Sequence, residues 1–242
     1  MTVYIGNAVG DEHGKASGGK PGDQTGREVK IQAWYLNKKG WRVFRPCHVA
    51  EKLVYDMKAA CENDNIGYSQ EKRNTLYNVS KPYGFDCAKV ETPCECDCSS
   101  LVRVCILYSG IDIGNFNTST EPSKLLATGE FVEMVGTEYT DSYKKLKAGD
   151  ILCTKTKGHT AIVLNDGPNV DPPEPITPDI VIVNGKSVWV RDADSTKGKK
   201  LFVAHKGQEF ELIDVAPSGW YHILTAYPEA YITNKTRYTE LV

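Results

Sequence analysis

Apolar positions recur at two different spacings along this chain, and they divide it into a mixed first part and a β-rich second part. Residues 48–65 carry apolar side chains at helical spacing, which predicts an amphipathic helix. A second helix is expected over residues 98–110, where the pattern ends at a glycine. From about residue 149 the pattern changes to that of strands, first over 150–153 and then over 159–164.

Beyond residue 179 short apolar runs alternate with turn signals. The turn signals are dipeptides such as Asn184-Gly185 and Lys206-Gly207. The apolar runs lie over 180–183, 187–191, 200–204, 209–213, 220–223 and 230–232. Short strands at this spacing predict a small all-β barrel.

Proline marks the boundary between the two parts. Residues 165–179 contain five prolines and several acidic residues, which exclude a helix or a central strand. We therefore expect an N-terminal domain over 1–165, an extended linker over 166–179 and a C-terminal domain over 180–242.

Residues 10–26 are rich in glycine and predict a loop. This loop lacks the Gly-Lys-Ser or Gly-Lys-Thr that opens a phosphate-binding helix.

Composition and charge narrow the function classes. Among the 242 residues, 40% are hydrophobic and 25% are charged, which is typical of a folded globular protein. The net charge of −2 argues against nucleic acid as the main partner, because phosphate binding needs a clustered excess of Lys and Arg. No apolar run approaches the length of a membrane span, and the first residues lack the pattern of a signal peptide. We expect synthesis in a host cytoplasm, and the sequence leaves the oligomeric state open.

Cys98 and His159 are the strongest candidates for chemistry. Cys98 opens an apolar helix, where unpaired N–H groups and the helix dipole favour a thiolate. Asp97 is expected to cap that helix, and the Cys98 N–H to help form an oxyanion hole. His159 opens an apolar strand, and a paired imidazole accepts the thiol proton. We expect His159, Ala161 and Val163 to share the face of that strand that lies against the Cys98 helix, which puts the imidazole near the thiol.

A cluster of cysteines precedes the helix. Cys87, Cys94, Cys96 and Cys98 fit a zinc site poorly, because structural zinc needs two ligand pairs at regular spacing. Buried thiols are the better prediction in a reducing compartment, and a disulfide formed after release from the cell stays open.

Four motifs in order resemble those of the NlpC-like, papain-fold peptidoglycan hydrolases. They are Pro82-Tyr83-Gly84, Asp97-Cys98-Ser99-Ser100-Leu101-Val102, Gly149-Asp150-Ile151 and Gly158-His159. The resemblance implies an α+β, papain-like catalytic domain that cleaves a peptide or amide bond of bacterial peptidoglycan without a cofactor. It also implies that Cys98 is the nucleophile, His159 the base and Tyr83 a neighbour of the oxyanion site.

The chain departs from that family in two places. The family places a third polar residue on the strand after the histidine strand, where it orients the imidazole. Here Asp166 or Asn165 is the nearest candidate in sequence, and we take Asp166, with Asp23 and Gln24 of the N-terminal loop as further candidates. Residues 1–80 have no counterpart in the family core. Their aromatic segment, around Trp34, Tyr35 and Trp41, predicts either a wall of the substrate groove or a structural cap.

The C-terminal domain resembles a bacterial Src-homology-type (SH3b) wall-binding domain. The matching segments are Val188-Trp189-Val190-Arg191, Gly219-Trp220-Tyr221 and Ala230-Tyr231-Ile232. Wall-binding candidates are Trp189, Trp220, Tyr221 and Tyr231, although aromatic residues also fill the core of a small barrel. An enzyme joined to a wall-binding domain suggests a phage endolysin, which acts on the wall after release and does not insert into the membrane.

Two other classes of function are weighed against this one. The first is a wall-binding or adhesion protein with a degenerate, non-catalytic papain-like domain, which the missing third residue keeps open. The second is a zinc-stabilised interaction module, which stoichiometric metal in the purified protein would reveal.

Overall fold

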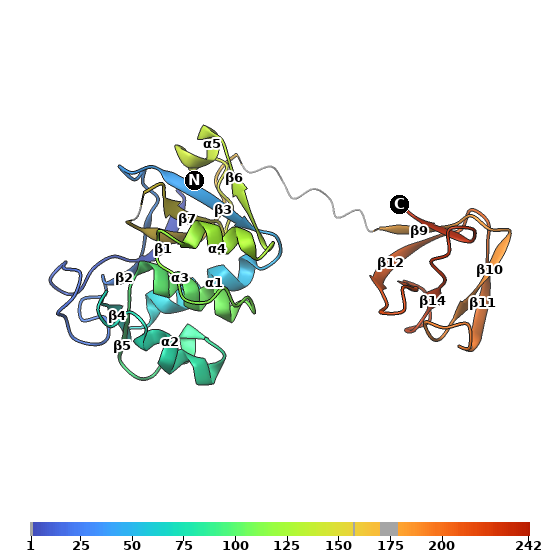
Figure 1. Ribbon diagram of the computed structural model, residues 1–242, viewed down its shortest axis with the longest axis horizontal. Coiled ribbons are helices and arrows are strands. Elements are labelled where there is room, and N and C mark those ends of the chain that lie inside the picture. The colour runs from blue at the N-terminus through green and yellow to red at the C-terminus, as the bar shows by residue number, and fades with distance from the viewer. Residues whose placement is uncertain (1, 157, 170–178) are drawn as a thin grey trace. The chain divides into compact units, whose positions relative to one another are not determined.

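The computed structural model describes residues 2–156, 158–169 and 179–242, and the chain divides into two units, Met1–Pro172 and Pro173–Val242 (Figure 1). The linker predicted over 166–179 falls mostly on residues 170–178, which lie outside the described residues. Both helices and strands form the first unit, so the mixed α+β class expected for it is confirmed. None of the described helices is both long and apolar enough to span a bilayer.

The first unit is built around one antiparallel sheet. Its strands are β1 (Tyr4–Ala8), β2 (Val29–Ala33), β3 (Trp41–Pro46), β6 (Phe131–Met134), β7 (Ile151–Thr154) and β8 (Thr160–Val163). They lie in the order β2-β1-β8-β7-β3-β6. A separate parallel pair consists of β4 (Ile66–Tyr68) and β5 (Cys94–Cys96).

Helices lie between these strands in sequence. They are α1 (Ala50–Glu62), α2 (Thr75–Ser80), α3 (Cys98–Tyr108), α4 (Glu121–Ala127), α5 (Thr137–Thr140) and the 3₁₀ helices η1 (Lys81–Tyr83) and η2 (Cys87–Lys89). The two helices expected from the apolar spacing are therefore present as α1 and α3. Helix α3 stops where Gly110 takes a φ of +99°, a backbone conformation that favours glycine.

The sheet buries apolar side chains on both faces. One face packs against α1 and α3 through a core that includes Leu53, Leu101 and Ile162. The other face carries a second core that includes Trp41, Ala161 and Val163. The expectation that Ala161 and Val163 face the Cys98 helix was therefore wrong. Ile162 takes that role, because successive side chains on a strand alternate between its faces.

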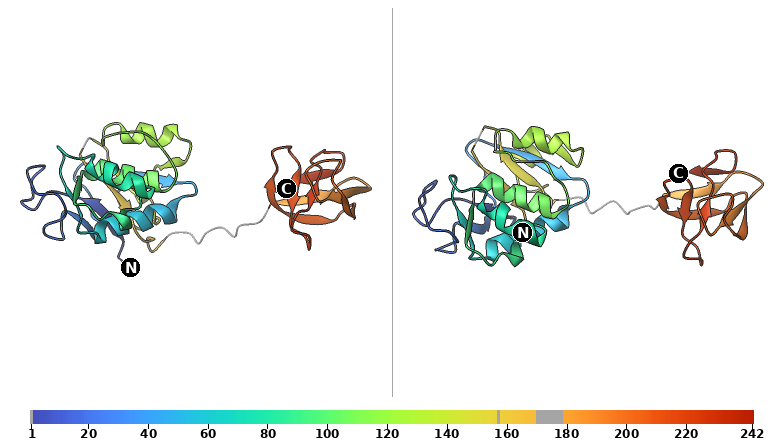
Figure 2. Two further views of the ribbon diagram at one scale, coloured as in Figure 1. Left: turned by 90° about the horizontal axis from the view of Figure 1, so that it is seen from below. Right: turned by 60° about the horizontal axis from the view of Figure 1, so that its bottom comes forward.

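The N-terminal residues form part of this sheet. Strand β1 pairs with β2 on one side and with β8 on the other, where Ile5 lies opposite Val163. The third polar residue was expected on a strand that follows the histidine strand in sequence. Here β1 occupies the position beside β8. Residues 1–80 therefore contribute the strands β1, β2 and β3 to the central sheet of the unit (Figure 2).

The second unit contains only strands among its described residues. They are β9 (Ile180–Val183), β10 (Ser187–Arg191), β11 (Lys200–His205), β12 (Glu209–Val215), β13 (Tyr221–Ile223), β14 (Tyr231–Ile232) and β15 (Thr239–Leu241). The order is β11-β10-β14-β13-β12-β9-β15, and no pairing joins β11 to β15. The expected closed barrel is therefore not found among the described residues. A small core that includes Val190, Ile223 and Ile232 holds the sheet together.

Candidate active site

The nucleophile candidate stands at the first position of α3. The Asp97 carboxylate accepts a hydrogen bond from the Ser100 N–H at 2.7 Å, and the Asp97 N–H donates to Ser100 Oγ at 2.8 Å. These two bonds form a reciprocal capping box, which fixes where the helix begins. The predicted cap is confirmed, and it places Cys98 in the first turn of α3.

Cys98 is almost fully buried. Its side chain is 6% exposed, and burial raises the pKa of the thiol to about 12, with the charges of Asp97 and Glu121 adding to the rise. The backbone N–H groups of Thr160 and Ser99 donate to the sulfur and oppose this rise. The thiol is therefore protonated at neutral pH in the free protein, and its local hydrogen bonds favour the anion once the proton leaves.

His159 lies directly before β8 and is held on both sides. Its backbone N–H donates to Thr154 Oγ1 at 3.0 Å, and its ring Nε2 lies 2.9 Å from Asn7 Oδ1. The Trp41 ring packs nearby, with the ring centroids 6.3 Å apart. Burial lowers the pKa of His159 to about 4, so the imidazole is neutral at neutral pH.

Asn7 determines which imidazole nitrogen carries the proton. The Asn7 amide nitrogen donates to the Lys30 carbonyl at 3.1 Å, and Asn7 Oδ1 accepts from Gln32 Nε2 at 3.0 Å. A carbonyl oxygen only accepts, so the Asn7 amide must place its oxygen toward His159. Nε2 is therefore the protonated nitrogen, and Nδ1 keeps a lone pair that can act as a base.

The chain on either side of His159 meets Cys98. The Thr160 N–H donates to the Cys98 sulfur. Gly158, on the other side of His159, lines with Cys98 a hollow of about 450 Å³. Gly158 is held there by its N–H, which donates to Thr118 Oγ1 at 3.1 Å. The residues on both sides of His159 thus lie at Cys98, while the His159 ring itself contacts Asn7 and Trp41.

Arg73 lines this hollow and holds the residues around it in place. Its Nε lies 2.7 Å from an Asp97 carboxylate oxygen, and one Nη donates to Ser99 Oγ at 2.8 Å and to the Phe116 carbonyl at 2.6 Å. Arg73 ties the cap of α3 to the preceding loop and balances the charge of Asp97.

A buried carboxyl group lies behind Cys98. Glu121, the first residue of α4, is fully buried and accepts from Thr160 Oγ1 at 2.7 Å. Burial raises the pKa of Glu121 to about 8, so it is mostly protonated at neutral pH. Thr160 therefore links two buried groups: its N–H contacts the sulfur and its hydroxyl contacts Glu121.

Two predicted site residues lie elsewhere. Tyr83 ends η1 with 46% of its surface exposed and does not line the hollow at Cys98. Burial raises the pKa of two other tyrosines, Tyr35 and Tyr68, and both lie close enough to Cys98 for its charge to add to the rise. Asp166 accepts from the Ala148 N–H at 2.8 Å, and the contact to the His159 ring comes from Asn7.

The N-terminal loop candidates for the third residue serve their own loop. The Asp23 carboxylate accepts hydrogen bonds from the backbone N–H groups of Thr25, Arg27, Glu28 and Val29. The Gln24 amide donates to the carbonyls of Pro21 and Gly22. The sequence held one signal for the residue that does contact His159. Asn7 is a polar residue within the apolar strand Tyr4–Ala8, and it is 1% exposed. Arg73 and Glu121 carried no comparable signal.

The cysteine cluster does not form a recognisable metal site. All eight cysteines are free thiols, and Cys87, Cys94 and Cys96 are buried in the core of the first unit. Within the described ranges no group of three or more His, Cys, Asp or Glu side chains is arranged to hold a metal ion. The geometry gives the zinc-stabilised alternative no support.

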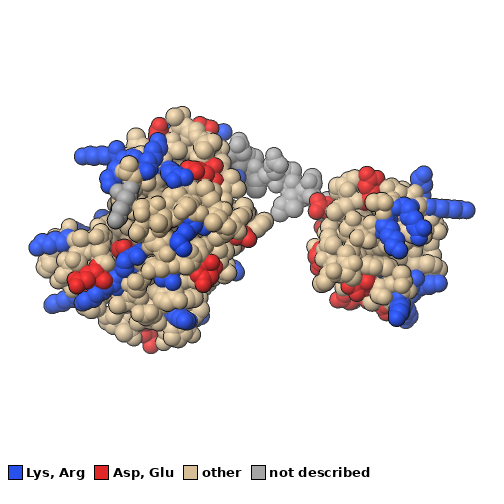
Figure 3. All heavy atoms as spheres, in the orientation of Figure 1, with Lys and Arg blue, Asp and Glu red and all other residues tan. Residues whose placement is uncertain are grey.

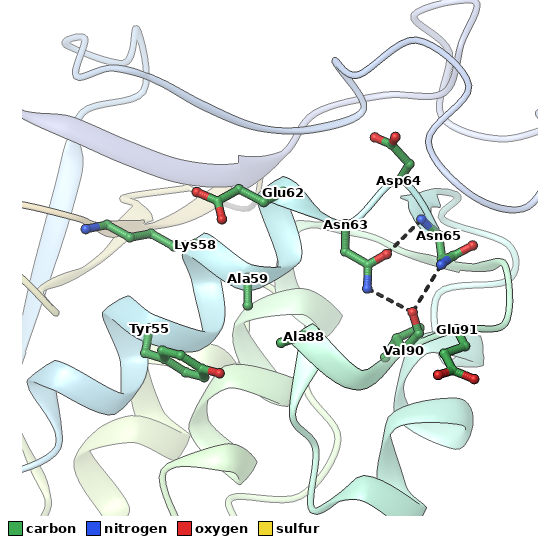
Figure 4. A pocket seen from close by; sticks show the side chains of 10 residues that line it. All are labelled: Tyr55, Lys58, Ala59, Glu62, Asn63, Asp64, Asn65, Ala88, Val90 and Glu91. Atoms are coloured by element: carbon green, nitrogen blue, oxygen red, sulfur yellow. Dashed lines mark hydrogen bonds between the residues drawn. The ribbon is translucent and has the colours of Figure 1, made fainter.

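A larger hollow lies away from this site. It measures about 780 Å³, and its lining residues come from α1, the turn after it and the segment around η2 (Figure 4). The Asn63 and Asn65 amides at its floor donate to the Val90 carbonyl, which shows that they hold the chain in place. Neither Cys98 nor His159 lines this hollow, so we assign the chemistry to the smaller one.

The four aromatic residues expected to bind the wall occupy different places in the second unit. Trp189 and Trp220 line one pocket of about 250 Å³. Tyr221 packs against the core of the unit. Tyr231 stacks on the His222 ring and donates to Glu229 at 2.5 Å. The structure therefore brings only the two tryptophans together.

Comparison with known proteins gives a family for the first unit. Residues 5–170 match the family model described as endolysin-like domain. The matched span is more than half of the chain and includes Asn7, Cys98 and His159. No curated protein and no solved structure matches the chain.

Proposed function

Because the chain belongs to the endolysin-like domain family, we propose that it is a bacterial cell-wall hydrolase that uses Cys98 as its nucleophile. The observation that carries this proposal is the contact between His159 Nε2 and Asn7 Oδ1, with Gly158, the residue before His159, lining the same hollow as Cys98. A cysteine, a histidine and an asparagine are the side chains that a cysteine hydrolase uses as nucleophile, base and orienting residue. The matched family supports the peptidoglycan of a bacterial wall as the substrate class.

The proposed reaction is acyl transfer through a thioester. The Cys98 thiol gives its proton to His159 Nδ1 while the sulfur attacks the carbonyl carbon of a peptide or amide bond. The tetrahedral intermediate collapses when the C–N bond breaks, and the imidazolium returns the proton to the leaving amine. Water then attacks the thioester with His159 again as base, which releases the acid and restores the thiol.

The resting state of the pair is neutral. Burial raises the pKa of Cys98 and lowers that of His159, so the ion pair forms only as the substrate carbonyl is attacked. The two N–H donors on the sulfur and the helix dipole of α3 stabilise the charge that develops. The Cys98 N–H, at the first turn of α3, is oriented for the oxyanion in this scheme. Asn7 keeps the imidazole in the tautomer that the first step requires.

The alternative, a wall-binding protein with a degenerate catalytic domain, depended on a missing third residue. Asn7 supplies the contact that the sequence around Asp166 did not supply. The hydrolase is therefore the better-supported function. We also propose that the chain acts on the wall after release from the cell, as endolysins do.

The test is release of soluble fragments from purified cell walls by the full chain and by Cys98→Ala, read by mass spectrometry. We expect the wild type to release fragments whose new amino and carboxyl ends identify the bond that is cut. Cys98→Ala should lower the rate by at least about 10³-fold, because the other groups cannot form the thioester.

Two controls separate chemistry from folding. Cys47→Ala removes an exposed thiol in the same unit and should leave the rate unchanged. Circular dichroism and thermal unfolding should match the wild type for both variants. Walls of several chemistries that stay intact with the wild type, while the protein still binds them, would contradict the proposal and favour the non-catalytic alternative.

A further inference from the structure

The second unit contains a pocket whose lining combines flat aromatic rings with positive charge. The pocket lies beside β10 and the segment that leads into β15, and its volume is about 250 Å³. The lining residues that carry the argument are Trp189, Arg191, Trp220, Lys235, Arg237 and Tyr238. Trp189 is 41% exposed, so a large part of its ring is free for contact with a ligand.

The charge of this lining is unbalanced. Three of the lining residues are Lys or Arg, and among the described residues that line the pocket none is acidic. Residues 179–242 as a whole carry eight basic and eight acidic side chains, so the unit has no excess of positive charge. The imbalance is local, and Figure 3 shows Lys and Arg gathered on the side of the unit where Figure 1 labels β10 and β11.

Cations and rings are already in contact at the pocket. The Arg237 guanidinium lies 4.5 Å from the centroid of the Tyr238 ring. The Lys200 ammonium lies 4.6 Å from the centroid of the Trp189 ring and adds a further positive charge next to the lining. Arg191 donates one Nη to the Gly198 carbonyl at 2.7 Å, which fixes its guanidinium. These contacts hold cations in place without neutralising them.

We propose that this pocket binds an acidic saccharide of the bacterial wall, with the sugar face on the indole of Trp189 or Trp220 and its anionic group on Arg237 and Lys235. An indole face packs against the apolar face of a sugar ring, and a guanidinium or ammonium group pairs with phosphate or carboxylate. The acidic group has two sources in a wall, namely the phosphodiesters of accessory polymers and the carboxylates of peptidoglycan itself. This inference rests on the proposed function, because the wall is the ligand of both.

The test measures binding to walls without cleavage. The full chain with Cys98→Ala is incubated with purified walls of a Gram-positive bacterium, and the bound fraction is measured after sedimentation. In this background we expect Arg237→Gln to lower the affinity about fivefold and Trp189→Ala about tenfold. Lys206→Gln removes one exposed charge outside the pocket, and Tyr227→Ala removes an exposed aromatic ring outside it. Both should bind like the parent.

Two further arms identify the anion. Raising the salt concentration from 0.05 to about 0.5 M should weaken binding of the parent and reduce the difference caused by Arg237→Gln, because salt screens charges. Hydrofluoric acid removes phosphodiester-linked polymers from walls. Loss of the pocket-dependent binding after this treatment supports the phosphate source, and its persistence supports the carboxylate source.

The proposal is overturned if binding of the parent does not change with salt, or if Arg237→Gln and Trp189→Ala bind like their controls while all variants remain folded. Failure of the hydrolase is recognised separately. A wild-type chain that releases no fragments but binds walls through Arg237 and Trp189 would contradict the proposed catalysis and leave the pocket assignment intact.

Discussion

In the N-terminal unit the residues of the candidate site are buried, whereas in the C-terminal unit the residues of the proposed binding pocket are largely open to solvent. Asn7 and Cys98 are 1% and 6% exposed, while Trp189 is 41% exposed. Burial changes the pKa of a group and so controls proton transfer, which is the task of the first site. Exposed cations keep their charge, and their attraction depends on salt. Variants that affect cleavage should therefore differ from those that affect binding.

The largest effect on the buried site, apart from loss of Cys98, is expected from Asn7. Asn7→Ala should lower the rate of wall hydrolysis about 10²-fold, because the imidazole loses the acceptor that selects its tautomer. Binding to walls should stay unchanged. Asp166→Ala is the matched control and should keep the wild-type rate. An equal loss in both variants would contradict the assignment.

Asn7→Asp provides a more sensitive test of the same contact. The carboxylate keeps an acceptor at Nε2 but stabilises the imidazolium, so the pKa of His159 rises from its depressed value. Activity requires the neutral imidazole, and the acid limb of the pH–rate profile should therefore move to higher pH. A limb that stays in place would show that residue 7 does not contact the ring during turnover.

Glu121 should govern stability at alkaline pH. Burial raises its pKa from 4.5 to about 8, so the folded chain keeps a proton that the unfolded chain releases between these values. The stabilisation is complete below about pH 4.5 and is lost as the pH rises through about 8. Glu121→Gln keeps a neutral acceptor for Thr160, and it should raise stability at pH 9 by about 5 kcal/mol but change little at pH 5.

Glu133 is a matched control for Glu121, because its pKa is shifted in the opposite direction. Hydrogen bonds from Arg42 lower the pKa of Glu133, so its contribution is present at neutral pH and is lost in acid. Thermal unfolding of Glu133→Gln should therefore approach that of the wild type as the pH falls. If Glu121→Gln and the wild type have parallel stability curves from pH 5 to 9, Glu121 does not titrate in this window.

Substitution of Arg73 should have a smaller effect on the rate of wall hydrolysis and none on wall binding. Arg73→Gln leaves the Asp97 carboxylate uncompensated beside Cys98, and that charge raises the pKa of the thiol. We expect about a tenfold lower hydrolysis rate, together with slower alkylation of Cys98 by iodoacetamide, read peptide by peptide by mass spectrometry. Lys72→Gln, which removes a more exposed partner of Glu95, should change neither.

The smallest change in hydrolysis rate is expected from substitution of the tyrosines. Tyr68→Phe should lower hydrolysis about fivefold, because it removes the hydroxyl that accepts a hydrogen bond from Gln70, a residue that lines the hollow. Tyr83→Phe alters an exposed side chain away from the hollow and should leave the rate unchanged. A larger effect from Tyr83 would show that η1 closes on the site when substrate binds.

Features that depend on neighbours in sequence were predictable. Helix α3, its Asp97 cap and the position of Cys98 follow from a short local pattern, and the structure confirms them. The face of β8 was not predictable in the same way, because the alternation depends on which residue meets the sheet first. The strand begins at Thr160, so Ile162 faces the helices.

Asn7, the residue that contacts the His159 ring, could not be predicted from sequence patterns because of the strand order in the sheet. A search along the chain after His159 leads to Asn165 and Asp166, but the strand beside β8 is β1, from the opposite end of the unit. Register between strands so far apart in sequence is set by tertiary packing. The same holds for Arg73, which reaches Asp97 across the loops between α2 and α3.

The pairing of β1 with β8 also sets the order in which the site is assembled. Strand β1 can pair early with β2, which follows it closely in sequence, but Ile5 must wait for Val163. Contacts between distant segments form late, because closing a long loop costs entropy before the contact stabilises it. During synthesis the chain therefore carries Asn7 and Cys98 before His159 is joined to it and can contact Asn7. The proposed enzyme becomes competent only when the last strand of its sheet docks against the first.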